Sequence, residues 1–246
     1  MNNNNSAANE PNDSHRAVQG IGLKAILRFI VYILLMPLTL FLAAGSLDWP
    51  EGWMLVAFTV VITLLSRIII ARKHPDLLAE RARYAEAEDA KKWDRTIVAL
   101  AAIYGPFVVW IVAGLDWRFN WSSPVSTTWQ ITAAVILVLG YSVSVWAMAV
   151  NKFFSAVVRI QKDRGHKVVD TGPYRLVRHP SYISGMLAYI ALPVFLDTLW
   201  ALVPIAPVIA LTIIRTILED RTLLAELDGY RGYAQRVRYR LIPGVW

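Results

Sequence analysis

Residues 127–150 read TTWQITAAVILVLGYSVSVWAMAV and contain no Asp, Glu, Lys or Arg. A run of about 20 mostly apolar residues is long enough to cross a bilayer as a helix. Its apolar residues follow one another almost continuously instead of forming one face of a soluble helix, which indicates that lipid surrounds the segment. The stretch therefore predicts a transmembrane helix.

Five more apolar stretches of the chain have the same character. They are Lys24–Leu47, Gly52–Ala71, Thr96–Leu115, the shorter Tyr182–Leu196, and Thr198–Leu218. Hydrophobic residues make up 56% of the 246-residue sequence, whereas a soluble domain has about 45–50%. We therefore expect an all-α fold, a polytopic membrane bundle of about six transmembrane helices.

The connections between these stretches alternate in charge. Segments 72–95 and 151–180 carry seven Lys or Arg residues each, whereas 47–51 and 196–199 carry none. Cytoplasmic loops of membrane proteins are rich in Lys and Arg, so we expect both termini and both long loops of this multi-pass protein to be cytoplasmic. Trp residues lie at the opposite ends of the stretches, as in an outer aromatic belt: Trp49, Trp53, Trp117, Trp121, Trp129 and Trp200.

Three parts of the chain differ in composition. Residues 1–22 are polar and Asn-rich and are expected to form a disordered tail. Residues 23–150 are expected to form a four-helix transmembrane region, with 72–95 as a solvated helical connector on the lipid headgroups. Residues 151–246 hold most of the remaining polar side chains, and we expect them to form the functional core.

Composition excludes several kinds of site. The chain has no Cys, which excludes disulfides, zinc–thiolate sites and cysteine nucleophiles; no metal site is expected. The net charge of +7 falls in particular loops, which suits anionic membrane lipids and not nucleic acid. Gly20-Ile21-Gly22 follows no strand, so it predicts no dinucleotide site. Oligomeric state is not determined by the sequence.

Polar residues concentrate after Asn151. Such residues are costly next to lipid and mark functional sites in membrane proteins. His179-Pro180 predicts the start of a helix, whose free N–H groups suit an anion. Arg215 lies near the end of the last apolar stretch, Glu219 follows four residues later just beyond it, and Asp220 follows Glu219. An ordinary Arg215–Glu219 pair within the helix is one interpretation of that spacing and a ligand site is the other.

The segment GPYRLVRHPSYISG (172–185), the Glu219-Asp220 pair and a Tyr-rich tail ending RLIP (240–243) resemble the isoprenylcysteine carboxyl methyltransferase family, which shares its core with the phospholipid methyltransferases. The resemblance covers roughly residues 150–243. It implies a helical membrane bundle whose C-terminal loops and helices enclose S-adenosylmethionine at the cytoplasmic membrane face. The chain is thereby expected to be an S-adenosylmethionine-dependent methyltransferase.

The resemblance also implies roles for matched residues. Arg215 matches an arginine that meets the substrate, and Arg215, His179 and Glu219 are the expected catalytic residues. The tail is about a residue shorter than in the family before Tyr230, and only Asp220 extends the acidic pair; both departures concern the substrate side. The positions that match cofactor contacts are Gln161, His166, Lys167, Val168, Val169, Tyr174, His179, Pro180, Ser181, Tyr182 and Glu219.

The chemistry of methyl transfer suits these residues. The Glu219 carboxylate is suited to the ribose hydroxyls or the ammonium group of S-adenosylmethionine, since charge-assisted hydrogen bonds are strong. An acceptor carboxylate is already ionised at neutral pH, whereas an amine needs a proton acceptor, for which His179 and Glu219 are the candidates. We expect a lipid-like or prenylated substrate that enters from the bilayer, with O-methylation of an isoprenylcysteine-type carboxylate first and phospholipid N-methylation as the alternative.

Three other classes of protein remain open. NADPH-dependent sterol and steroid reductases of membranes carry a similar Arg-His-Pro motif, but this chain has Ser181 where they have Asn and Met186 where an acid follows. A lipid-binding protein that lost its activity would be expected to lose its costly buried polar groups. A transporter would need polar residues in several spans, and the first four stretches have almost none.

Overall fold

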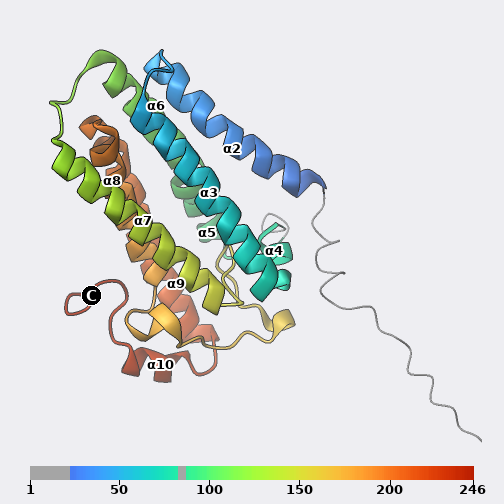
Figure 1. Ribbon diagram of the computed structural model, residues 1–246. Helices are drawn as coiled ribbons and strands as arrows, with labels where there is room; N and C mark the ends of the chain where they lie inside the picture. The colour runs from blue at the N-terminus through green and yellow to red at the C-terminus, as the bar shows by residue number, and fades with distance from the viewer. Residues whose placement is uncertain (1–22, 83–86) are drawn as a thin grey trace, which may run out of the picture.

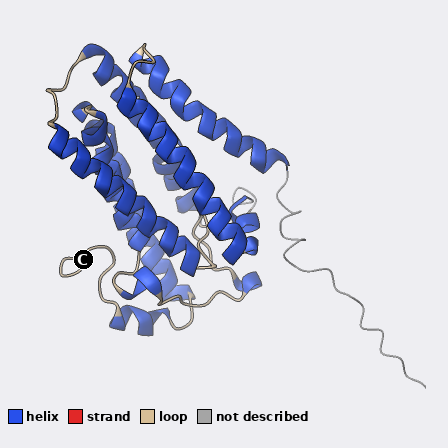
Figure 2. Cartoon of the chain, in the orientation of Figure 1, coloured by secondary structure: helices blue, strands red, loops and turns tan. Residues whose placement is uncertain are grey.

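The computed structural model describes residues 23–82 and 87–246, and within these ranges the chain is helical with no strand (Figures 1 and 2). Residues 1–22, which hold the predicted disordered tail and Gly20-Ile21-Gly22, lie outside the described residues. The all-α prediction is confirmed. The helices are α2 Leu23–Ala44, α3 Pro50–Lys73, α4 Pro75–Ala82, α5 Lys92–Val98, the π-helix η2 Ala99–Tyr104, α6 Gly105–Phe119, α7 Thr127–Val150, α8 Pro180–Leu196, α9 Leu202–Glu226 and α10 Tyr230–Arg236, with short 3-10 turns at Lys162–Arg164, Gly172–Arg175 and Leu199–Ala201.

Four helical segments are long and apolar enough to cross a membrane: Pro50–Lys73, Lys92–Phe119, Thr127–Val150 and Leu199–Glu226. Two shorter apolar helices, Ile30–Ala44 and Pro180–Leu196, correspond to the other predicted spans. The 17 residues of α8 reach about 26 Å at 1.5 Å per residue, a little less than the about 30 Å of a hydrocarbon core. The chain is therefore a polytopic helical membrane protein, as predicted.

Helix α9 extends beyond the predicted end of the last span. The apolar stretch ends at Leu218, but the helix continues to Glu226. Glu219 and Asp220 are thus consecutive residues of one helix. Because successive residues of an α-helix are rotated by about 100° (3.6 residues per turn), the two carboxylates project in different directions.

Helices α7 and α8 lie side by side along much of their length (Figure 1). A Cβ atom on Gly140 would lie 2.7 Å from the carbonyl oxygen of Ser184 and 3.1 Å from the Cβ of Ala188. The hydroxyls of Ser144 and Ser184 also form a hydrogen bond of 2.8 Å. Small residues therefore let the two backbones approach closely, as is common between membrane helices, and this contact fixes the first turns of α8.

The two ends of the bundle have different compositions. One end carries the short connections; there the buried Asp116 carboxylate accepts hydrogen bonds from the backbone N–H groups of Ser122 and Trp200. The other end, here called the site end, carries α4, the loop 151–179 and α10 (Figure 1). The basic segments gather at the site end. That this end faces the cytoplasm stays a prediction.

Candidate active site

A cavity of about 290 Å³ lies at the site end. It is bounded by α4, the loop 151–179, the start of α8 and the C-terminal half of α9. Pro180 is the one residue of the predicted set that does not line it; this residue is buried as the first residue of α8. The predicted residues on the cavity wall are Gln161, His166, Lys167, Val168, Val169, Tyr174, His179, Ser181, Tyr182, Arg215 and Glu219.

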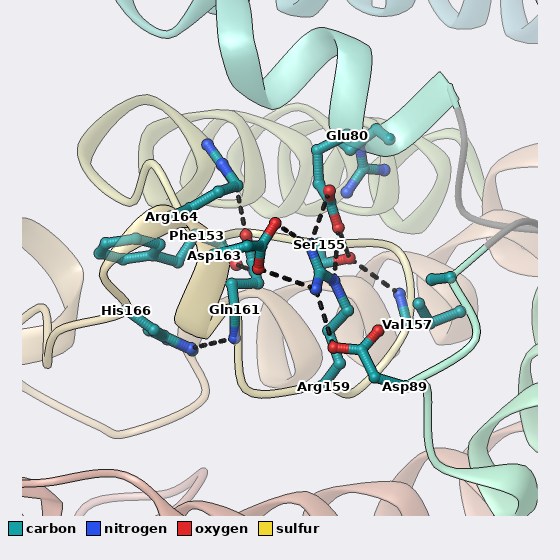
Figure 3. A network of polar contacts seen from close by, with 12 residues as sticks. Glu80, Asp89, Phe153, Ser155, Val157, Arg159, Gln161, Asp163, Arg164 and His166 are labelled. Atoms are coloured by element: carbon teal, nitrogen blue, oxygen red, sulfur yellow. Dashed lines mark hydrogen bonds and ion pairs between the residues drawn. The ribbon is translucent and has the colours of Figure 1, made fainter.

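Gln161 holds the loop in shape. Its side chain is buried, and its Nε2 group donates to the carbonyl oxygen of Phe153 over 2.7 Å. Its Oε1 accepts a hydrogen bond from Arg164, and its backbone N–H donates to Nδ1 of His166 over 3.3 Å (Figure 3). Gln161 therefore folds the loop back on itself and places His166 on the cavity wall.

His166 is neutral at physiological pH. Burial, together with the charges of Arg164 and Arg159, lowers the pKa of the imidazole from 6.5 to about 4. Because Nδ1 accepts the Gln161 backbone N–H, the ring proton sits on Nε2. The ring also packs against Phe153, with centroids 4.6 Å apart. His166 is thus a hydrogen-bond donor in this cavity and not a base.

Arg159 joins the loop to α4 (Figure 3). Its Nε and Nη2 atoms donate to the two Glu80 oxygens over 2.9 and 3.0 Å, and Nη1 donates to Asp89 over 2.9 Å and to Asp163 over 3.1 Å. These carboxylates raise the pKa of the Arg159 guanidinium, and Arg159 in turn lowers the pKa of the Asp163 carboxyl. Bidentate contact of this kind fixes geometry as well as charge. It holds α4 against the cavity.

Arg215 forms its ion pair with Asp94, at the start of α5. Its Nε donates to Oδ1 of Asp94 over 2.7 Å and its Nη2 to Oδ2 over 3.2 Å. Asp94 is fully buried and also accepts the backbone N–H of Val158 over 2.7 Å. The interpretation of Arg215 and Glu219 as an intrahelical pair is wrong, because a residue distant in sequence supplies the carboxylate.

Tyr182 and Glu219 form the centre of the cavity wall. The Tyr182 hydroxyl donates to a Glu219 oxygen over 2.5 Å, and the Arg215 guanidinium lies 5.4 Å from the centre of the Tyr182 ring. Glu219 forms no ion pair with any described residue. Its carboxylate is therefore available to a cationic or hydroxyl-bearing ligand.

Asp220 faces away from the cavity and is fully buried. It accepts hydrogen bonds from Arg178 (2.8 and 2.9 Å), Arg240 (2.8 Å) and the Tyr230 hydroxyl (2.9 Å), and the His179 Nε2 lies 3.4 Å away. The backbone N–H groups of Arg178 and His179 also donate to carbonyls in the tail. Asp220 thus joins the start of α8, α10 and the tail into one unit behind the site.

A second cavity of about 230 Å³ adjoins the first. It lies between the η2 region, α8 and α9, all within apolar helices. Gly185 opens into it, since a Cβ there would meet no atom within 4 Å. The residues shared by both cavities are Val98, Ala102, Ser181, Tyr182 and Arg215. The polar cavity therefore continues into an apolar one between membrane helices.

Sequence reasoning missed the contribution of segment 72–95. It predicted a solvated connector there, but Leu77, Ala79 and Asp94 are buried and Arg81 lines the cavity. That prediction is wrong, because Glu80 and Asp94 form ion pairs with arginines of the loop and of α9. The position of Asp94, three residues before the apolar run that begins at Ile97, could have indicated a buried carboxylate at this end of the helix.

The chain was compared with known protein families and with curated proteins. A family model described as phospholipid methyltransferase matches residues 129–227. The matched segment covers α7, the loop, α8 and α9 and leaves α4 and Asp94 outside it. No curated protein matches the chain.

Proposed function

We propose that this chain transfers the methyl group of S-adenosylmethionine to a lipid-like acceptor, and the match of residues 129–227 to the phospholipid methyltransferase model supports the proposal. The observation that carries the proposal is the pair of adjoining cavities, one polar and one apolar, that share Tyr182 and Arg215. The polar cavity receives the cofactor, and the apolar cavity receives the hydrocarbon part of the acceptor.

The residues of the polar cavity fit this cofactor. S-Adenosylmethionine supplies an activated methyl group on a sulfonium; it also carries an ammonium, a carboxylate and ribose hydroxyls. Glu219 offers a carboxylate that forms no ion pair with a described residue, and Tyr174 and Tyr182 offer ring faces for adenine or the methionine arm. The cavity of about 290 Å³ is at the lower end of the about 300–1,000 Å³ of ligand pockets. The walls position the ligands and exclude water, and alignment alone is worth about 7–11 kcal/mol.

The hydrogen bonds of the site favour a carboxylate acceptor. An amine acceptor must lose a proton, whereas a carboxylate is already ionised. His166 has its free lone pair engaged by Gln161, and His179 faces Asp220. Neither histidine is then a free base. N-methylation of a phospholipid is the second candidate, and for it Glu219 is the proton acceptor that the cavity offers.

The identity of the cofactor is tested by measuring the binding of S-adenosylhomocysteine and of NADPH to the purified protein in detergent. S-Adenosylhomocysteine is expected to bind and to raise the unfolding temperature, as any ligand of the folded state does; NADPH is expected to do neither. Calorimetry and thermal unfolding measure both. Binding of NADPH in place of S-adenosylhomocysteine would overturn the proposal and favour a reductase.

Gly185→Leu is expected to obstruct the acceptor and not the cofactor. A leucine side chain there projects into the apolar cavity without a clash at its Cβ. The KM for N-acetyl-S-farnesylcysteine, a long-chain carboxylate probe, is expected to rise at least tenfold, with the affinity for S-adenosylhomocysteine unchanged. Gly232→Leu in α10 is the control, because this exposed position also has open space around it. An unchanged KM in Gly185→Leu would argue against acceptor binding in this cavity.

A further inference from the structure

Arg81 of α4 is placed on the cavity wall by its neighbours. Glu80, the preceding residue, is held by Arg159 of the loop. The Nη1 atom of Arg81 donates to the carbonyl oxygen of Phe154 over 3.1 Å, and its guanidinium lies 5.5 Å from the centre of the Phe154 ring. The side chain is partly buried and lines the 290 Å³ cavity. An arginine has five N–H donors, and the Phe154 carbonyl takes one of them.

The other arginines of the cavity wall have carboxylate partners. Arg159 pairs with Glu80, Asp89 and Asp163. Arg178 pairs with Asp220, and Arg215 with Asp94. Over residues 23–82 and 87–246, Arg81 has no such partner, and the remaining cation of the wall, Lys167, is exposed to solvent. Arg81 is thus the arginine of the wall whose charge the described protein does not neutralise.

The surroundings of Arg81 are unfavourable to its charge. Burial, together with the positive charges of Arg67 and Arg215, lowers the pKa of its guanidinium to about 10. At neutral pH the group is still protonated. A cation kept in a cavity without a counterion is costly unless a ligand supplies one.

The pairing of Arg215 bears on the same question. The family resemblance implies that Arg215 meets the substrate, but Asp94 already occupies its Nε and Nη2 donors and Ala156 accepts a further bond from Nη2. Of the three guanidinium nitrogens of Arg215, only Nη1 takes no part in these contacts. Among the described arginines of the wall, Arg81 is therefore the one whose charge is left for an anionic ligand group.

We propose that Arg81 is an anion-binding residue of the cavity and receives a carboxylate or phosphate oxygen of a bound ligand. The guanidinium fork suits both groups. The proposal rests on the proposed function, because the ligand is one that methyl transfer requires: the amino-acid carboxylate of the cofactor, or an anionic group of the acceptor. Within the described residues, Glu219 and Arg81 are thus an acid and an arginine of the cavity wall that have no ion-pair partner.

The test uses probes that differ by their anionic group. Affinities of full-length wild-type protein and Arg81→Ala in detergent are measured for S-adenosylhomocysteine and its decarboxylated analogue, and for N-acetyl-S-farnesylcysteine and its methyl ester; lysophosphatidylethanolamine tests a phosphate. Arg81→Lys keeps the charge without the fork. Arg72→Ala is the matched control, since Arg72 is exposed at the same end of the bundle and does not line the cavity.

In Arg81→Ala, the affinity for one anionic probe is expected to fall at least tenfold, while its neutral or decarboxylated counterpart is unaffected. A loss confined to S-adenosylhomocysteine identifies the cofactor carboxylate, and a loss confined to the farnesylcysteine acid or the lysophospholipid identifies the acceptor. Arg81→Lys is expected to be intermediate and Arg72→Ala unchanged. Equal affinities in wild type and Arg81→Ala for every probe, or equal losses within each pair, would overturn the proposal. Absence of S-adenosylhomocysteine binding in the wild type would instead overturn the proposed function.

Discussion

Glu219→Gln is expected to weaken the binding of S-adenosylhomocysteine by about 10- to 150-fold and to remove most methyl transfer, with the fold intact. The Glu219 carboxylate lines the cavity and forms no ion pair with a described residue, so its charge is available to the ligand. A hydrogen bond to a charged group is worth about 1.5–3 kcal/mol, and each 1.36 kcal/mol is a factor of ten. Glutamine keeps the shape of the side chain and an oxygen for the Tyr182 hydroxyl.

The matched control is Glu226→Gln on the same helix. Glu226 is exposed and pairs with Lys91 over 2.6 Å, and exposed pairs contribute about 0–1 kcal/mol. Calorimetry measures the affinity of both variants for S-adenosylhomocysteine. It thereby distinguishes the effect of removing the carboxylate in the cavity from the effect of removing a carboxylate elsewhere on α9. If the two variants bound S-adenosylhomocysteine equally well, Glu219 would have no part in cofactor binding.

Asp220→Ala is expected to reduce the free energy of unfolding by about 3–5 kcal/mol, the usual cost of removing one partner of a buried ion pair. Arg178 is buried beside Asp220, and alanine leaves its guanidinium without a carboxylate. Arg240 and the Tyr230 hydroxyl lose the same acceptor. Because these groups hold the tail 237–246 against α8, proteases are expected to cleave the tail more readily in the variant.

Asp170→Ala provides the comparison for Asp220→Ala. Asp170 pairs with Arg236 of α10 over 2.9 Å, but the two side chains are 49% and 63% exposed. Its removal is expected to cost no more than about 1 kcal/mol. Thermal unfolding and limited proteolysis in detergent compare the variants at one scan rate, since unfolding of such proteins is often irreversible. Similar unfolding temperatures for the two would contradict the structural role of Asp220.

The helical spans were predictable because each depends on a contiguous stretch of sequence. The run 127–150 predicted α7 with its observed bounds, and the length of an apolar run is set by the bilayer and not by distant residues. Part of the candidate site was predictable for a similar reason, because many of its residues lie in one short stretch of sequence. Five residues of the motif at 172–185 line the cavity together with Glu219: Tyr174, Arg178, His179, Ser181 and Tyr182.

The pairing of charges was not predictable in this way. Arg215 has Glu219 one turn away, yet it pairs with Asp94, 121 residues distant. Glu219 and Asp220 are adjacent, but one lines the cavity and the other holds the tail. Charge and spacing define which partners are possible, and the packing of α4 and α5 on the loop and α9 selects among them.

The sequence by itself thus determined the class of fold, the apolar spans and the part of the cavity wall that the loop, α8 and α9 supply, since each follows from local composition or from a motif that resembles a known family. The tertiary structure alone decided which charges are neutralised by the protein and which remain for a ligand. The physical reason is that an ion pair inside the bundle depends on a distance of about 3 Å between side chains. For Arg159 and Arg215 that distance is set by segments that meet only in the folded chain.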